Sequence, residues 1–365
     1  MAKTAGDHTP TPSNDLTSRE EVIDMRALVL AEFGRMVVEE RPDPNPARGE
    51  VLIRIVATGI CGSDIHGFTG ANGRRVPGQV MGHESVGRVA SQGEGVDGLE
   101  IGHPVTFNPV VIPDADVQRY AGREQRCPNK YVIGVKPDVV SAFAEYVTVP
   151  ARNVVPLRED MPIDHGALIE PLAVAVHAVR RVGAGRGLAA LVVGGGPIGQ
   201  SIVLALALEG VVDIVVSEID PRRRALVERL GARTVDPAGG PVPEQVERLL
   251  DGRVDVALDA AGVSGSVADA LASTVPGGSV CLVGMGSPTL ELPAFAVSTE
   301  ERSLVGSFTY SAQDFRDAAQ WISTRPAVAA ELISRQVGLD EAPAAFTSLA
   351  AHDGTPGKVL VRFDR

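Results

Sequence analysis

The sequence contains few aromatic residues and few cysteines. Phe, Trp and Tyr make up 4% of the 365 residues, so the core must be built mainly from Val, Leu, Ile and Ala, which suits parallel strands buried on both faces. The three cysteines, Cys61, Cys127 and Cys281, are too few and too scattered for a disulfide framework. A reducing compartment is therefore expected, and we assign the protein to the cytoplasm.

Long apolar runs and basic clusters are also lacking. No apolar stretch approaches the roughly 18 residues needed to cross a bilayer, and the N-terminus lacks the basic and apolar regions of a signal peptide. Lys plus Arg number 34 against 46 for Asp plus Glu, giving a net charge of −12, and the one basic cluster is Arg222, Arg223 and Arg224. Nucleic acid and membrane surfaces are therefore not expected as partners.

The length of 365 residues favours two domains, because one hydrophobic core rarely grows so large. Residues 1–24 are polar and contain Pro10 and Pro12, which predicts a disordered tail. Short apolar runs separated by Gly and Pro follow, which indicates a β-rich structure with many loops. These runs are residues 27–30, 51–56, 85–89, 104–107 and 144–149.

Strands and helices alternate after Glu170, which predicts an α/β fold with a doubly wound parallel sheet. Strands are expected at 188–193, 213–217, 254–259 and 279–283, and helices at 172–182, 198–209, 222–230, 242–250 and 267–273. A helix at 313–322 and a strand at 358–363 are expected to return to the first domain. The predicted catalytic domain is therefore 25–170 completed by 312–365, with a cofactor domain inserted at 171–311.

A glycine-rich turn lies between the first expected strand and helix of the cofactor domain. Gly194, Gly196 and Gly199 form the GxGxxG pattern, and Glu218 ends the next strand 19 residues later. Such glycines let the backbone approach a pyrophosphate, and the following helix offers free N–H groups to it. A turn that merely packs a helix on a sheet is the alternative. The expected cofactor-binding residues are Gly194, Gly196, Pro197, Ile198, Gly199, Glu218 and Arg223.

The acid at position 218 predicts which dinucleotide binds. A carboxylate there accepts hydrogen bonds from the adenosine ribose and repels a 2′-phosphate, so NAD is expected rather than NADP. The arginines at 222–224 leave the NADP alternative open, because a guanidinium close to that carboxylate could bind the phosphate.

Four potential metal ligands precede the glycine turn: Cys61, His83, Glu84 and Glu170. Zinc takes sulfur, nitrogen and oxygen donors, and a catalytic zinc keeps one position open beside its protein ligands. Each residue alone is ordinary, since a lone cysteine is more often a small buried hydrophobe. The long separations between them require a folded scaffold to bring them together, unlike a structural zinc finger.

The motifs around these residues resemble zinc-dependent medium-chain dehydrogenases of the alcohol and polyol dehydrogenase family. The segment 59–66 reads GICGSDIH, residues 82–84 read GHE, and Glu170 is followed by Pro171 in the family's order. The sorbitol and threonine dehydrogenase branch is most similar. This resemblance implies a GroES-like catalytic domain with an inserted Rossmann domain, and a homodimer or homotetramer.

The resemblance also implies roles for individual residues. Cys61, His83 and Glu84 match the zinc-binding positions, and Glu170 matches a carboxylate that ligates zinc or holds its water. Ser63 matches the hydroxyl that accepts the substrate proton, and His66 matches the imidazole that passes it on; a surface histidine is the alternative. Asp64 matches an acid that orients the metal-bound imidazole.

The chain departs from the family in one lobe. Many relatives bind a structural zinc there through four cysteines, but the positions counted back from Cys127 hold Arg119, Asp116 and Pro113. A single cysteine with these neighbours cannot complete a tetrahedral site, so we expect one catalytic zinc and no structural zinc.

The substrate itself is not identified by the sequence. Arg74 and Arg75 could bind a phosphate, a carboxylate or sugar oxygens, although a solvated loop is the favoured interpretation. Phe308 and Tyr310 lie where the chain re-enters the catalytic domain and are candidates for the pocket wall.

These observations predict an NAD-dependent zinc enzyme that transfers a hydride from a secondary alcohol to NAD and forms a ketone. A polyol, cyclitol or sugar derivative is the expected substrate. Two alternatives remain at this point: a zinc-free quinone or enone reductase of the same fold, and a non-catalytic NAD-binding protein.

Overall fold

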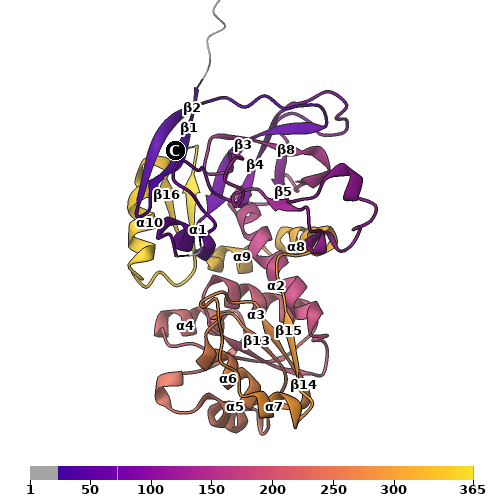
Figure 1. The fold of residues 1–365 in the computed structure, drawn as a ribbon, viewed down its shortest axis with the longest axis vertical. Coiled ribbons are helices and arrows are strands. Elements are labelled where there is room, and N and C mark those ends of the chain that lie inside the picture. The colour runs from indigo at the N-terminus through magenta and orange to yellow at the C-terminus, as the bar shows by residue number, and fades with distance from the viewer. Residues whose placement is uncertain (1–23, 72, 365) are drawn as a thin grey trace, which may run out of the picture.

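The computed structural model describes residues 24–71 and 73–364, which form two lobes (Figure 1). The upper lobe in Figure 1 combines the early part of the chain with its C-terminal part, and the lower lobe holds the segment between them. Most of the predicted tail lies outside the described residues. Asp24, which we assigned to that tail, is the first residue of strand β1 and corrects the boundary by one residue.

The upper lobe is built on a sheet of seven strands in the order β16-β17-β3-β4-β5-β9, with β8 also paired to β3. Along β3, Val51, Ile53 and Ile55 alternate with more exposed residues, so every second side chain enters the core. The strands are β3 Glu50–Gly59, β4 Glu84–Gln92, β5 Pro104–Phe107, β8 Tyr146–Pro150, β9 Val154–Pro156, β16 Ile333–Gly338 and β17 Lys358–Arg362.

Shorter elements complete this lobe. Two antiparallel pairs, β1 with β2 and β6 with β7, add to the main sheet, and helix α10 packs against β2 through Phe346. Their bounds are β1 Asp24–Glu32, β2 Arg35–Pro42, β6 Val110–Val111, β7 Tyr131–Val132, α1 Gly62–Phe68 and α10 Ala342–Ala350. The 3-10 helices of this lobe are Asp114–Asp116, Glu124–Arg126, Ala151–Asn153, Ile163–Leu168 and Leu339–Glu341, and Pro237–Gly239 lies in the lower lobe.

The C-terminal strand pairs with the third strand of the chain. β17 runs antiparallel to β3, and Leu360 lies opposite Gly59. In Figure 1 the yellow C-terminal segment accordingly lies in the upper lobe beside the indigo N-terminal strands. The intervening lobe is therefore an insertion in the chain, as the sequence predicted.

The lower lobe is a parallel sheet of six strands in the order β12-β11-β10-β13-β14-β15. Its strands are β10 Ala189–Val193, β11 Asp213–Ser217, β12 Arg233–Val235, β13 Val254–Asp259, β14 Thr274–Leu282 and β15 Ser303–Gly306. Its helices are α3 Pro197–Leu208, α4 Pro221–Arg229, α5 Val242–Leu250, α6 Ser264–Ser273 and α7 Ala294–Ser298. The strand order reverses between β10 and β13, the place where such sheets bind their ligands.

Helices α2 (Ile169–Arg181), α8 (Ala312–Thr324) and α9 (Pro326–Leu332) lie at the junction of the two lobes (Figure 1). α2 packs against both α3 and α8, and Leu172, Val176 and Val179 on it are fully or almost fully buried. The first turn of α2 carries Glu170, so the helix fixes this carboxylate against the upper lobe. Among the described residues, no helix is both long enough and apolar enough to span a bilayer.

The segment 113–128, in which we expected no structural zinc, makes hydrogen bonds through Asp116. Asn129 Nδ2 donates to Asp116 Oδ2 at 2.9 Å, and the Sγ of buried Cys127 lies 3.5 Å from the same oxygen. Arg152 Nη1 pairs with Asp114 Oδ1 at 2.6 Å. The one group of metal donors found among the described residues lies elsewhere, and absence of a structural zinc remains a prediction.

Replacing Asp116 should make the segment 113–128 more accessible to proteases. The Asp116→Ala protein loses the bond from Asn129, worth about 1 kcal/mol, so proteolysis within 113–128 should become roughly fivefold faster. Limited proteolysis with mass spectrometry measures this rate. Asp138→Ala is the control, because Asp138 is exposed and pairs with neighbouring Lys136. Equal cleavage rates in the two variants would contradict the assigned role of Asp116.

Candidate metal centre and dinucleotide turn

The candidate metal ligands meet where β3 ends and β4 begins. Cys61 follows β3 and precedes α1, while Glu84 is the first residue of β4 and lies opposite Gly59 in the antiparallel register. A Cβ on Gly59 would come within 2.3 Å of Glu84 Oε2, so only glycine leaves room for that carboxylate. Strand pairing thus places a cysteine and a glutamate side by side although 22 residues separate them.

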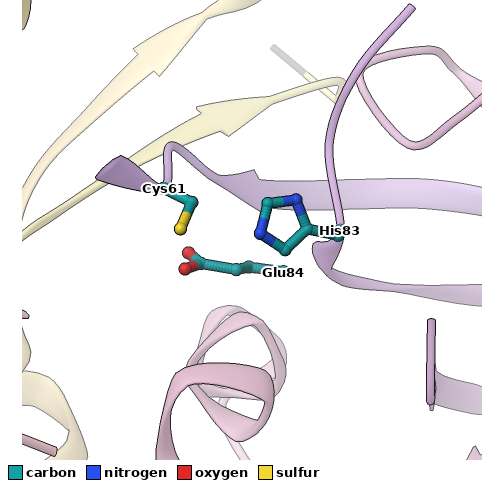
Figure 2. A group of neighbouring side chains, drawn as sticks. All are labelled: Cys61, His83 and Glu84. Atoms are coloured by element: carbon teal, nitrogen blue, oxygen red, sulfur yellow. The ribbon is translucent and has the colours of Figure 1, made fainter. Parts of the chain in front are cut away.

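Donor atoms of Cys61, His83 and Glu84 all lie within 4.8 Å of one another. Figure 2 shows the sulfur, the imidazole ring and the carboxylate pointing toward one another. Zinc bonds of 2.0–2.3 Å would separate its ligands by about 3.3–3.8 Å, so the donors need only a small approach to share one ion. Glu84 is fully buried, so its carboxylate requires a positive partner at this centre.

Asp64 lies next to the imidazole of His83, and Arg75 lies next to Asp64. Asp64 Oδ1 lies 3.6 Å from His83 Nδ1 and 3.4 Å from Arg75 Nη2. Asp64 is fully buried and Arg75 is 3% exposed, so the solvated-loop interpretation is wrong for Arg75. This position of Asp64 suits the expected orientation of a metal-bound histidine.

Lys358 is a buried cation that the sequence analysis missed. Its Nζ donates to Glu84 Oε1 at 2.7 Å and lies 2.7 Å from Oε2 as well. Burial disfavours the charged ammonium, but Glu84 and Cys61 outweigh this effect and raise the pKa of Lys358. The charged lysine therefore holds the carboxylate of Glu84 in place at the metal centre.

Glu170 approaches the centre from α2 but does not join the three clustered donors. Its Oε1 accepts a hydrogen bond of 2.9 Å from Tyr310 Oη, and Tyr310 is fully buried. Burial and the charge of Glu84 raise the pKa of Glu170 to about 7, against the opposing effects of His83 and Tyr310. Burial also raises the pKa of Tyr310, so its hydroxyl remains a donor.

The electrostatics of the centre favour a bound cation. Burial alone would lower the pKa of His83, yet Asp64, Cys61 and Glu170 raise it to about 10. The centre therefore attracts a proton in spite of its burial. With Cys61 as the thiolate that binds zinc, the centre has four acidic groups and two buried cations, and a divalent ion would neutralise the remainder.

Ser63 and His66 lie on α1, directly after Cys61. Ser63 is half-buried, and its Oγ lies 3.5 Å from His83 Nε2. His66 is exposed and lines a cleft of about 460 Å³ between the lobes, together with Ala71, Arg74 and the loop 284–288. Ser63 therefore lies beside the metal centre, and His66 lies further along α1 at the cleft.

The dinucleotide turn has the geometry that its glycines predicted. Gly194 has a φ of +100°, and a Cβ on Gly199 would come within 1.8 Å of Gly194 O, so helix α3 packs directly on the turn. Pro197 and Ile198 are the first residues of α3. The turn thus presents the N-terminus of α3 at the switch point of the sheet.

Glu218 and one of three consecutive arginines border this turn. Glu218 is 5% exposed; its Oε2 accepts from Gly195 N at 2.7 Å and its Oε1 from Asp220 N at 2.8 Å. Arg222 is bound to Asp220, and Arg224 to the carbonyls of Glu218 and Ile219. Arg223 is the arginine whose guanidinium lies against Gly196.

Comparisons with known proteins match both lobes. Residues 47–159 match the model described as "Alcohol dehydrogenase GroES-like domain", and residues 197–324 match "Zinc-binding dehydrogenase". D-xylulose reductase A of Aspergillus niger is 31% identical, over 90% of this chain and 94% of its own. Sorbitol dehydrogenase 1 of Saccharomyces cerevisiae is 30% identical, over 92% of this chain and 97% of its own.

Solved structures resemble the whole two-lobed fold. A protein of Sinorhizobium meliloti solved with NADP has a TM-score of 0.85 and 32% identity, covering 93% of this chain and 100% of its own. An alcohol dehydrogenase of Escherichia coli CFT073 solved with NADH has a TM-score of 0.84 and 26% identity, covering 93% and 99%. The predicted fold class, a GroES-like domain with a Rossmann domain, is confirmed.

Zinc should bind more tightly as the pH rises. Zinc must displace the proton from His83, whose pKa is raised to about 10, so the apparent affinity should increase about tenfold per pH unit for each proton released between pH 6 and 8. Competition with a chelator at each pH measures this slope. His103→Asn, which alters a histidine paired with Glu159, should keep it. An affinity independent of pH would contradict this account of His83.

Proposed function

The chain belongs to the zinc-dependent medium-chain alcohol dehydrogenase family, and we propose that it oxidises a secondary alcohol to a ketone while NAD is reduced to NADH. A polyol, cyclitol or sugar derivative is the proposed substrate, and the reaction is reversible. The observation that carries this proposal is the convergence of Cys61, His83 and Glu84 in a protein that also has the dinucleotide turn.

We assign Cys61, His83 and Glu84 as the zinc ligands. Glu170 is assigned as the carboxylate that either joins them or holds a water, because Tyr310 fixes one of its oxygens next to the group. Bound there, zinc supplies Lewis-acid chemistry that lowers the pKa of an alcohol. Lys358 and Arg75 keep the carboxylates of Glu84 and Asp64 oriented toward the ligand set.

The substrate proton leaves through the residues of α1. Ser63, within 3.5 Å of the His83 ring, accepts the proton of the substrate hydroxyl. The exposed imidazole of His66, which lines the cleft, would take the proton over and release it to solvent. One proton and one hydride thus leave the carbinol, and the ketone and NADH remain.

NAD is proposed as the preferred dinucleotide. Its pyrophosphate would lie against Gly194, Gly196, Gly199 and the first residues of α3, and the carboxylate of Glu218 would accept the ribose hydroxyls. Arg223 provides the nearest positive charge for a 2′-phosphate. Because similar structures hold either NADP or NADH, the acid at 218 is the residue on which this preference rests.

The two alternative functions use the site less completely. A zinc-free quinone or enone reductase would give the converging Cys61, His83 and Glu84 no role. A non-catalytic NAD-binding protein would equally leave Ser63 and His66 without a function. The relatives named above as reductase or dehydrogenase also favour the enzyme.

A homodimer or homotetramer in the cytoplasm is the proposed assembly. β15 ends the six-stranded sheet, so its outer edge offers backbone groups to a second copy. Phe295, on the α7 helix just before β15, is 81% exposed. All three cysteines are free thiols, which suits a reducing compartment.

Removing the hydroxyl of Ser63 should abolish most turnover without loss of metal. Ser63→Ala should lower kcat/KM by about 10²- to 10⁴-fold for any alcohol that the wild type oxidises, because the substrate proton loses its acceptor. NADH formation, zinc content and NADH binding are measured together. Ser298→Ala, on exposed α7, is the control. Undiminished turnover in Ser63→Ala would contradict the proton path.

Neutralising Glu218 should relax the choice of cofactor. The wild type should have a higher kcat/KM with NAD than with NADP, and Glu218→Gln should narrow that ratio by about tenfold, because the charge that repels the 2′-phosphate is gone. Arg223→Gln should instead lower kcat/KM with NADP further. A wild-type preference for NADP would contradict the role given to Glu218.

A further inference from the structure

A buried histidine outside the proposed reaction connects helix α2 to the start of helix α8. His177 Nδ1 donates to Asp314 Oδ2 at 2.9 Å, because an ionised carboxylate can only accept. The two residues are 9% and 5% exposed. Gln125 Nε2 lies 3.3 Å from the other ring nitrogen of His177. In Figure 1 α2 and α8 meet at the junction of the lobes, so His177 links the two helices at that junction.

Asp314 also holds the first turn of α8. Its Oδ2 accepts from Ser311 N at 3.0 Å and from Ser311 Oγ at 2.7 Å, and the two residues form a capping box. Burial alone would raise the pKa of Asp314, but hydrogen bonds from His177 and Ser311 help to hold it below its usual value. One oxygen of a charged carboxylate therefore serves both the helix cap and His177.

The residue just before this cap is Tyr310, whose hydroxyl donates to Glu170 at the metal centre. Glu170 and His177 are seven residues apart on α2, so they lie on the same face of the helix, about 10 Å apart along its axis. The start of α8 is thus attached to α2 at two points. With both attachments in place, the hydroxyl of Tyr310 has little freedom to turn away from Glu170.

Arg180 is a second partner of Asp314 but a less specific one. It binds the other oxygen, Oδ1, at 2.9 Å, and its guanidinium is shared with Asp317 and Glu209. The side chain of Arg180 is 38% exposed, so solvent screens its ion pairs. The bond from His177 is buried and lies on the oxygen that caps α8, which makes it the closer constraint on this turn.

We propose that His177 is a positioning residue for the metal centre. By binding Asp314 it fixes the start of α8, and it thereby holds the hydroxyl of Tyr310 on Glu170. This inference rests on the proposed function for the role of Glu170 at zinc. It adds that a histidine two helical turns away determines how that carboxylate is presented to the metal.

The test uses two amide substitutions that separate the ring nitrogens of His177. The side-chain nitrogen of asparagine can replace Nδ1, so His177→Asn keeps a donor for Asp314, whereas that of glutamine replaces Nε2 and His177→Gln loses the donor. Tyr310→Phe removes the hydroxyl that reaches Glu170. Asp317→Asn is the matched control, because Asp317 lies on the same helix and pairs with Arg180 at an exposed position.

Zinc affinity is measured by competition with a chelator, so this result does not depend on turnover. His177→Gln and Tyr310→Phe should each bind zinc about tenfold more weakly than the wild type, because Glu170 loses its fixed orientation. The variant with both changes should be within about twofold of Tyr310→Phe, since both changes break the same connection. His177→Asn and Asp317→Asn should stay within about twofold of the wild type.

Turnover provides a second measurement. At saturating zinc, and with an alcohol that the wild type oxidises, kcat of His177→Gln should fall about tenfold while KM changes less than about twofold. His177→Asn should restore most of kcat. This split between kcat and KM separates a misplaced carboxylate from a lost binding contact.

Several results would overturn the inference. An unchanged zinc affinity in His177→Gln would do so, as would a loss of about a hundredfold in the double variant, because the two residues would then act independently. Equal losses in His177→Asn and His177→Gln, or a similar loss in Asp317→Asn, would indicate a general loosening of α8 instead. Absence of NADH formation with every alcohol would overturn the proposed function, and the zinc affinities would still decide the role of His177.

Discussion

Four acidic side chains packed around one point determine how the rest of this molecule is built. Asp64, Glu84 and Glu170 are buried on α1, β4 and α2, and half-buried Cys61 is the N-cap of α1. Gathering their negative charges is unfavourable unless cations accompany them. Arg75 and Lys358 provide two positive charges. Because negative charge still exceeds positive charge, the pKa of His83 rises to about 10. A divalent metal ion would balance the remaining negative charge, so the centre is best understood as a cation site.

The chain topology brings residues from distant parts of the sequence to this centre. Strand β17 returns from the C-terminus to pair with β3, and its first residue, Lys358, reaches Glu84. The chain leaves the cofactor lobe through the loop that carries Tyr310, which reaches Glu170. A C-terminal strand and the loop that leaves the cofactor lobe thus each contribute one residue to the centre. The cofactor lobe is therefore connected directly to the metal centre, and the cleft lined by Arg74 lies between the two lobes.

Much of this arrangement could be predicted from the sequence, because short motifs preserve local geometry. The glycines from Gly194 to Gly199 determined the turn, and the strand 213–217 and helix 242–250 matched the structure at both ends. Lys358 was not singled out, and Tyr310 was expected as a candidate for the pocket wall and not as a partner of Glu170, because their partners are 274 and 140 residues away in the chain. Arg74 and Arg75 have the same chemistry, and the sequence does not show that Arg75 packs against Gly67 and pairs with Asp64. The elements α9, β16 and α10 were missed because they are only six to nine residues long.

Metal content is the most direct test of the central claim that Cys61, His83 and Glu84 share one zinc ion. The protein and its Cys61→Ser variant are dialysed against a weak chelator, and zinc per chain is determined by mass spectrometry of the acid-digested samples. The account predicts about one zinc per chain in the wild type and almost none in the folded variant. Less than about half a zinc in the wild type, or equal zinc in both proteins, would contradict it.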